Sequence, residues 1–220
     1  MRILLFGRNG QVGWELARSL GPLGDLVSHD ADTLDLADAQ ATRVVIREVA
    51  PKVIVNAAAY TAVDRAETEV EKASALNAEA PRVIAEEACR LNCLLVHYST
   101  DYVFDGTKAG AYLESDLPNP LNAYGRTKLA GERAVIASGC HHLIFRTSWI
   151  YGARGQNFLL TMLRLGRERT ELGVVDDQIG APTCSGWVAA VTAQALARVI
   201  DRSGPKRDDA QQESGLYHLS

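Results

Sequence analysis

The sequence lacks several features that define membrane and nucleic-acid-binding proteins. Its 23 Lys and Arg residues are outnumbered by 27 Asp and Glu residues, and no basic run occurs, so it has no electrostatic signature of nucleic-acid binding. No apolar stretch approaches the length of a membrane span. Residues 1–5 predict a strand rather than a signal peptide. We therefore expect a cytoplasmic protein with no nucleic-acid or membrane partner.

Cysteine and histidine are also scarce, with four Cys and five His among 220 residues. Cys89 and Cys93 are spaced i, i+4 on a predicted helix, which is too far apart for C-x-x-C chemistry, and no second ligand pair accompanies them. We interpret the cysteines as core-filling residues in a reducing compartment, and we expect no metal site. No histidine is assigned a catalytic role.

A glycine-rich turn stands directly between the first predicted strand and the first predicted helix. Its spacing is G-x-x-G-x-x-G, formed by Gly7, Gly10 and Gly13. The first glycine permits a tight turn, the second lets backbone approach a pyrophosphate, and the third lets helix pack closely on strand. The helix N-terminus, with Gln11 and Val12, supplies free N–H groups and a positive dipole for the phosphates. The motif predicts a dinucleotide site.

Strand and helix patterns alternate through residue 150. Strands are predicted at 2–6, 25–29, 53–55, 94–98 and 143–146. Helices are predicted at 11–20, 38–49, 68–91 and 122–138. This alternation predicts βαβ units and an α/β fold with a doubly wound parallel sheet of the Rossmann type. We expect residues 1–150 to form the NAD(P)-binding domain.

The cofactor contacts expected beyond the glycine turn leave the choice of nucleotide open. Asp30, which ends the second strand, stands where a carboxylate binds the adenosine ribose, although it is nearly as well explained as a turn cap. Asp30 favours NADH, whereas Arg8 offers a charge for the 2′-phosphate of NADPH. Further cofactor contacts are expected from two short segments, namely Asp35, Leu36, Ala57, Ala58, Ala59, Tyr60 and Thr61. Tight packing is the alternative explanation for the alanines.

Three side chains predict acid–base chemistry at a carbonyl oxygen. Thr100 follows an apolar strand, at the sheet edge where ligands bind in parallel α/β folds. Tyr124 and Lys128 are i, i+4 on one face of a helix that Asn122 is expected to cap. An ammonium near a phenol favours the phenolate, so we expect the pKa of Tyr124 to be lowered from about 10. Glu132, one turn further, is interpreted as an ordinary surface pair.

Several longer motifs resemble those of a known enzyme family. The segments N-A-A-A at 56–59, S-T-D-Y-V-F-D-G at 99–106 and Y-G-R-T-K-L-A-G-E at 124–132 resemble extended short-chain dehydrogenases/reductases. The segments F-R-T-S-W-I-Y-G at 145–152 and D-Q-I-G-A-P-T at 177–183 narrow the resemblance to the dTDP-4-dehydrorhamnose reductases within them. The resemblance extends over essentially the whole chain.

The resemblance implies that NADPH or NADH reduces the C4 ketone of dTDP-4-dehydro-β-L-rhamnose to dTDP-β-L-rhamnose. This reaction completes the synthesis of the activated rhamnose of bacterial surface polysaccharides. By family role, Tyr124 is the proton donor, and Lys128 binds the nicotinamide ribose and tunes Tyr124. Thr100 adjusts the phenol and contacts substrate, and Asp101 and Trp149 contact the dTDP-deoxysugar.

The resemblance also implies a smaller substrate-binding lobe. We expect residues 151–220 to supply parts of it with returns to the core, and to be incomplete at the C-terminal end because the family continues further. A polar loop is expected at 206–212 and a strand at 215–220. Some family members dimerise through Mg²⁺ held by glutamates. Glu15 corresponds to one candidate, but C-S-G-W at 184–187 offers no carboxylate, so this Mg²⁺ site is doubtful here.

Further expectations concern assembly and alternatives. Both a monomer and a homodimer fit the sequence, and Asn77 resembles the superfamily's structural asparagine, which supports a proton-relay water. One alternative is a nucleotide-sugar dehydratase or epimerase. A 4,6-dehydratase usually carries an Asp–Glu pair after the threonine, but Asp101 is followed here by Tyr102. A second alternative, a non-catalytic NAD(P)-binding regulatory subunit, has no chemical need for the tuned phenol.

Overall fold

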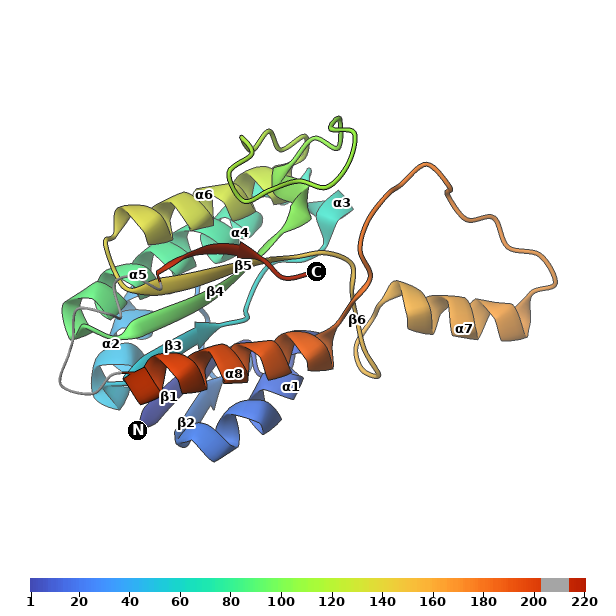
Figure 1. The fold of residues 1–220 in the computed structure, drawn as a ribbon. Coiled ribbons are helices and arrows are strands. Elements are labelled where there is room, and N and C mark those ends of the chain that lie inside the picture. Colours follow the sequence, from blue (N-terminus) through green and yellow to red (C-terminus); the bar gives the residue numbers. More distant parts are fainter. Residues whose placement is uncertain (203–213) are drawn as a thin grey trace.

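A parallel β-sheet forms the centre of the protein (Figure 1). The computed structural model describes residues 1–202 and 214–220, so the polar loop expected at 206–212 lies outside the described residues. The six-stranded sheet has the order β2-β1-β3-β4-β5-β8, and all its pairs are parallel. Its strands are β1 (Arg2–Phe6), β2 (Asp25–His29), β3 (Val53–Asn56), β4 (Leu94–Thr100), β5 (His142–Thr147) and β8 (Gly215–His218). The doubly wound parallel sheet is therefore confirmed.

The helices of the described residues include those expected at 11–20, 38–49 and 122–138, within one residue at each end, and others at 63–66, 158–168 and 185–202 that the sequence did not predict. They are α1 (Gln11–Leu20), α2 (Ala39–Val49), α3 (Val63–Ala66), α4 (Val70–Ser74), α5 (Ala80–Leu91), α6 (Ala123–Ala137), α7 (Phe158–Glu168) and α8 (Ser185–Arg202), with short 3₁₀ turns η1 (Gly21–Leu23) and η3 (Asp101–Val103). Asp38 caps α2 by accepting hydrogen bonds from Gln40 N and Ala41 N. Asn122 caps α6 as expected, accepting from Gly125 N at 2.7 Å.

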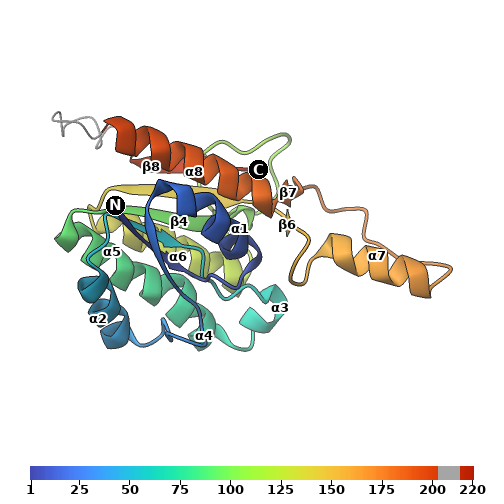
Figure 2. The same cartoon turned by 90° about the horizontal axis from the view of Figure 1, so that it is seen from below.

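Helices cover both faces of the sheet (Figure 2). On one face α1 and α8 pack together, and on the other α5 packs against both α2 and α6. Side chains of β1 alternate between the two cores: Leu4 and Phe6 face the α2–α5–α6 layer, whereas Ile3 and Leu5 face the α1–α8 layer. Because both sides of each central strand are buried, the strands read as continuous apolar runs rather than alternating ones.

The helix predicted over 68–91 is interrupted by a π-helical turn. Between α4 and α5, the turn η2 (Ala75–Glu79) has the i→i+5 hydrogen bonding of a π-helix in place of the i→i+4 pattern of an α-helix. Asn77, in this turn, is fully buried. π-Helical turns inside α-helices are frequent at functional sites, and this one faces α6.

A long arm extends from the body between two short strands. The strands β6 (Ile150–Tyr151) and β7 (Thr183–Cys184) pair in parallel, and residues 152–182, called the arm below, connect them. The arm contains α7, which projects away from the sheet in both views (Figures 1 and 2). No residue of α7 is buried, and apolar side chains such as Phe158 and Leu163 are exposed.

The structure corrects the interpretation of Glu132 as a surface residue. Glu132 is only 1% exposed, and its two carboxylate oxygens accept hydrogen bonds from Arg146 of β5 at 2.9 and 2.7 Å. The guanidinium also lies 4.9 Å from the ring centre of Phe104. α6 lies against β5, so the face that carries Tyr124, Lys128 and Glu132 turns toward the sheet rather than to solvent.

The cysteines fill the core only in part. Cys93 and Cys140 are buried, and burial raises the pKa of the Cys93 thiol to about 12. Cys184 is half-buried, and Cys89 is exposed. The expectation of core filling is therefore wrong for Cys89, because its position on α5 faces outward whereas Cys93 lies in the core under α5.

Breaking the buried ion pair should destabilise the fold strongly. We expect Glu132→Gln to lower the free energy of unfolding by about 3–5 kcal/mol, because it leaves Arg146 charged, buried and uncompensated. Denaturant titration measures this loss. Lys72→Ala, which removes an exposed partner of Glu69, is the control and should cost less than about 1 kcal/mol. Equal losses of unfolding free energy in the two variants would contradict the role of Glu132 in a buried ion pair.

Candidate functional site

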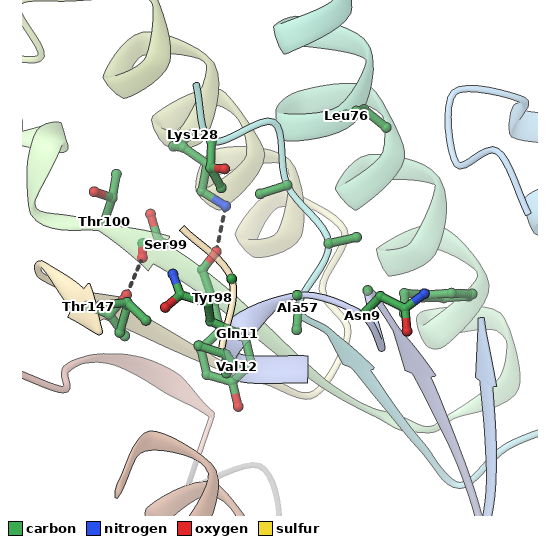
Figure 3. Close-up of a pocket in the computed structure, with 18 of the residues that line it drawn as sticks. Asn9, Gln11, Val12, Ala57, Leu76, Tyr98, Ser99, Thr100, Lys128 and Thr147 are labelled. Atoms are coloured by element: carbon green, nitrogen blue, oxygen red, sulfur yellow. Dashed lines mark hydrogen bonds between the residues drawn. The ribbon is translucent and has the colours of Figure 1, made fainter. Parts of the chain in front are cut away.

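A pocket of about 920 Å³ opens at the carboxyl ends of the parallel strands (Figure 3). It brings together segments that are far apart in the chain: the glycine turn, the ends of β2, β3 and β4, and the first turns of α6. Sixteen of the residues predicted for the site line it: Gly7, Gly10, Gln11, Val12, Asp30, Asp35, Leu36, Ala57, Ala58, Ala59, Thr61, Thr100, Asp101, Tyr124, Lys128 and Trp149. Gly13, Tyr60, Asn77 and Arg8 are not among the lining residues.

The glycine turn has the geometry of a phosphate cradle. Gly7 has φ +81°, and a Cβ there would lie 2.6 Å from Ala58 N. A Cβ on Gly13 would lie 1.9 Å from the carbonyl oxygen of Gly7, so helix and turn are in direct backbone contact. Gly10 occupies the N-cap of α1 and offers no side-chain acceptor, which leaves backbone N–H groups at the helix start for an anion. These features fit the pyrophosphate of a dinucleotide.

Asp30, which follows β2, has features of both a turn cap and a cofactor contact, the two explanations that the sequence left open. Its Oδ1 accepts a hydrogen bond from Asp32 N at 3.0 Å, which is a turn-capping contact. Asp30 nevertheless lines the pocket, and Asp35, which similarly accepts from Ala37 N at 2.9 Å, lines it as well. Both carboxylates are thus fixed in orientation at the wall of the pocket where an adenosine would lie.

Asn77 joins the loop after β3 to α6. Its Oδ1 accepts from Tyr60 N at 2.8 Å, and its Nδ2 donates to Tyr60 O at 3.0 Å and to Thr127 Oγ1 at 3.2 Å. The Thr127 hydroxyl in turn donates to the backbone oxygen of Tyr124 at 2.9 Å. Tyr60 therefore contributes through its backbone to the support of the pocket. The side-chain amide of Asn77 is fully engaged in holding these two segments together.

Lys128 is buried at the base of the pocket. It is 2% exposed, and its Nζ donates to the backbone oxygen of Tyr98 at 2.6 Å, as the dashed line in Figure 3 shows. Burial lowers the pKa of Lys128 to about 8, and the charge of Glu132 one turn away opposes this shift. The burial of Lys128 therefore brings its pKa close to neutral pH, and the ammonium is still mostly charged at pH 7.

The phenol of Tyr124 is tuned differently from the expectation. Burial raises the pKa of Tyr124 to about 12, whereas its hydrogen bond with Thr100 acts in the opposite direction. The expected lowering of the Tyr124 pKa is wrong for this structure, because the burial of the phenol outweighs the interactions that would lower it. The ring edge of Tyr102 packs against Tyr124 with 5.5 Å between centroids. At neutral pH the phenol therefore carries its proton, as a donor must.

A short hydrogen-bond chain leads away from Thr100. Its hydroxyl accepts from Tyr102 N at 3.2 Å and donates to Asp101 Oδ1 at 3.0 Å. The other carboxylate oxygen of Asp101 accepts from Ser148 Oγ at 2.6 Å. Sequence reasoning missed Ser148, although its place just after β5, beside the end of β4, was a usable signal. The chain fixes Asp101 at the mouth of the pocket.

Trp149 is held in an unusual backbone conformation. Its φ is +43°, in the left-handed region, and its side chain is 42% exposed. A Cβ on Gly180 would lie 2.4 Å from the indole Cε2, so the D-Q-I-G motif packs a glycine directly against the ring. The arm and the end of β5 thereby meet at an aromatic wall of the pocket.

The remaining lining residues were not predicted. They come mostly from strand ends and from the arm: Phe6, Asn9, His29, Ala31, Leu34, Val63, Leu76, Tyr98, Ser99, Tyr102, Thr147, Ile150, Gly155, Gln156 and Phe158. Those at strand ends could have been found by extending each predicted strand to its carboxyl end. The arm residues carry no such signal.

The described residues, 1–202 and 214–220, contain neither a metal-binding cluster nor a membrane-spanning helix. No group of three or more His, Cys, Asp or Glu side chains within this part of the chain could hold a metal ion, and Glu15 belongs to no such group. No helix in the same ranges is long and apolar enough to cross a bilayer.

One pocket at the edge of the parallel sheet is lined by the glycine turn and by the face of α6 that carries Tyr124 and Lys128. This combination defines a dinucleotide-binding reductase of the short-chain dehydrogenase type. The chain belongs to the RmlD substrate binding domain family, whose profile matches residues 1–220. Its relatives include dTDP-4-dehydrorhamnose reductases from Burkholderia thailandensis, 50% identical over 220 residues, and from Escherichia coli K12, 48% identical over 223 residues. Each alignment covers 100% of this chain and 72% of the relative.

A solved structure extends this likeness to three dimensions. The dTDP-4-dehydrorhamnose reductase of Bacillus anthracis, in complex with NADP, is 37% identical and superposes with a TM-score of 0.90. The match covers 100% of this chain and 74% of that one.

Adding one methyl group to the glycine turn should weaken cofactor binding strongly. In Gly13→Ala the new Cβ would collide with Gly7 O, so the turn must open and the phosphate cradle must distort. We expect the Kd for NADPH, measured by fluorescence titration, to rise more than about tenfold. This corresponds to a loss of more than about 1.4 kcal/mol of binding free energy. Gly21→Ala, at the other end of the helix with nothing within 4 Å, is the matched control and should bind normally. Normal NADPH binding by Gly13→Ala would refute the cradle.

Proposed function

We propose that this chain catalyses reduction of the C4 ketone of dTDP-4-dehydro-β-L-rhamnose to dTDP-β-L-rhamnose with NAD(P)H. The observation that carries the proposal is that Thr100, Tyr124 and Lys128 share one pocket with the glycine turn. Family membership and the names of the relatives support the same reaction. A protein that only bound the dinucleotide would not need a buried proton donor beside it.

In the proposed mechanism the protein orients the ketone and supplies a proton. The nicotinamide cofactor, when bound, supplies the hydride to C4. Tyr124 donates its phenolic proton to the carbonyl oxygen, which becomes the C4 hydroxyl. Thr100 hydrogen-bonds the same oxygen and the phenol. Lys128 holds the nicotinamide ribose and offsets the negative charge that Tyr124 gains as the proton leaves.

The substrate and cofactor contacts follow from the walls of the pocket. Asp101, fixed by Ser148, and Trp149 are proposed to contact the dTDP-deoxysugar. The glycine turn would hold the pyrophosphate, and Asp30 the adenosine ribose. The NADP complex of the Bacillus anthracis relative supports NADPH as a cofactor. The dehydratase alternative is disfavoured because Tyr102, and not a glutamate, follows Asp101.

We further propose a division of labour along the chain. Residues 1–150 would bind the cofactor and carry the catalytic groups, while 151–220 would supply parts of a substrate lobe with returns to the core. The projecting arm supports the substrate lobe in this division, and the packing of α8 on α1 and of β8 on β5 supports the returns to the core. We propose a cytoplasmic enzyme that acts as a monomer or homodimer.

Removing the phenolic hydroxyl tests the reaction directly. We expect Tyr124→Phe to lower kcat with dTDP-4-dehydrorhamnose and NADPH by at least about 100-fold, because the proton donor is lost while ring volume is kept. Cofactor affinity should be unchanged. Tyr102→Phe, which removes a hydroxyl from the neighbouring ring in the same pocket, is the matched control and should retain most turnover. Near-normal turnover in Tyr124→Phe would exclude it as the donor.

The pH dependence should follow the titration of Lys128. The mechanism needs the charged ammonium, and its pKa is lowered to about 8, so the active form is present below this value and is lost above it. We expect kcat/KM, which reports the free enzyme, to fall about tenfold per pH unit above pH 8. In Lys128→Arg any residual activity should lack this inflection, since a guanidinium stays charged. A flat wild-type profile through pH 10 would contradict the role.

A further inference from the structure

The root of the arm is tied to the glycine turn by a single side chain. The sequence predicts Gln11 as a cofactor contact, but its side-chain amide faces the arm. Its Oε1 accepts a hydrogen bond from Asn157 Nδ2 at 2.8 Å, and its Nε2 donates to Gln156 O at 3.3 Å. Both ends of the Gln11 amide are therefore engaged by two consecutive residues of the arm.

Asn157 connects this contact to the helix of the arm. It is the N-cap of α7, and its Oδ1 accepts from Leu160 N at 2.9 Å. Its Nδ2 donates to Gly152 O at 3.0 Å as well as to Gln11. The same side chain thus begins α7 and attaches it to the beginning of α1.

Two further contacts hold the same part of the arm against α1. A Cβ on Gly155, which has φ +74°, would lie 3.0 Å from Gln11 Cγ, so the loop passes close over the glutamine. The guanidinium of Arg154 lies 3.5 Å from the ring centre of Trp14, one turn further along α1. Because no residue of α7 is buried, the contacts at the two ends of the arm hold it in place, and those around Gln11 hold the end that leads into α7.

We propose that Gln11 is a positioning residue that couples the cofactor turn to the arm. Its backbone lies in the phosphate cradle, and its side chain holds Gln156 and Asn157. Gly155, Gln156 and Phe158 line the same pocket, so the position of the arm shapes the part that the sugar nucleotide would enter. The inference deepens the proposed function and rests on it for the identity of the substrate, but the coupling itself is a structural claim.

Two variants and one control isolate the contact. Gln11→Ala removes both hydrogen bonds to the arm. Asn157→Ser keeps an N-cap oxygen for α7 but removes the donor to Gln11. Gln156→Ala is the matched control, because it deletes a glutamine side chain from the same loop while keeping the backbone oxygen that Gln11 uses.

Spin labels measure the position of the arm without requiring turnover. Cys89 is exposed on α5 and takes one label, and Glu168→Cys at the end of α7 takes the other, in a Cys184→Ser background. Double electron–electron resonance gives the distribution of distances between the two labels. We expect this distribution to broaden in Gln11→Ala and Asn157→Ser, and to stay as in the wild type in Gln156→Ala. Because both variants remove the hydrogen bond between Gln11 and Asn157, the double variant should broaden the distribution by less than the sum of the two single effects.

Binding and kinetics separate this role from direct cofactor contact. In both variants the Kd for NADPH should stay within about twofold, and the KM for the sugar nucleotide should rise about threefold to tenfold, as for loss of one or two hydrogen bonds. An unchanged distance distribution together with a tenfold weaker NADPH complex in Gln11→Ala would overturn the proposal. If the wild type shows no turnover, the proposed reaction fails, while the distance measurement still decides the coupling.

Discussion

The attachment of α6 to the sheet is the constraint on which the rest of the site depends. One face of this helix carries Tyr124, Lys128 and Glu132, and all three turn inward because Glu132 pairs with Arg146 of β5 inside the protein. A buried ion pair contributes little net stability, but it tolerates few alternative arrangements, since any shift leaves a charge uncompensated. The pair therefore fixes the helix along the strand, and the two turns before Glu132 reach the carboxyl edge where ligands bind.

A second contact fixes the same helix on the adjacent face, which carries Thr127 and Gly131. Asn77, in the π-helical turn, holds the backbone of Tyr60 and the hydroxyl of Thr127 together. The wider turn η2 lies close to α6, and a Cβ on Gly131 would lie 2.1 Å from the carbonyl oxygen of Asn77. The helix that carries the proposed proton donor and the loop expected to contact the cofactor are thus held together by direct contacts. Precise placement of this kind is what proton transfer and hydride transfer require.

Burial then gives the two titratable groups distinct roles. The pKa of Tyr124 is raised to about 12 and that of Lys128 is lowered to about 8, so the phenol keeps its proton at neutral pH while the ammonium is close to titrating. A protonated phenol suits the reducing direction, in which the oxygen must gain a proton. Thr100 links this phenol to Asp101 and Ser148, which places the proposed proton donor and the carboxylate proposed to contact the substrate in one hydrogen-bonded group.

The sequence alone determined the alternation of the main strands and helices up to residue 146, the glycine turn and the Tyr124–Lys128 pair, because each of these has a local signal. Continuous apolar runs mark strands buried on both faces, and the cap at Asn122 marks where α6 begins. Only the tertiary structure decided that Glu132 is buried, that Ser148 supports Asp101 and that Gln11 faces the arm. Each of these depends on which segment lies opposite a side chain, and that neighbour is brought there by packing across the sheet rather than by sequence spacing.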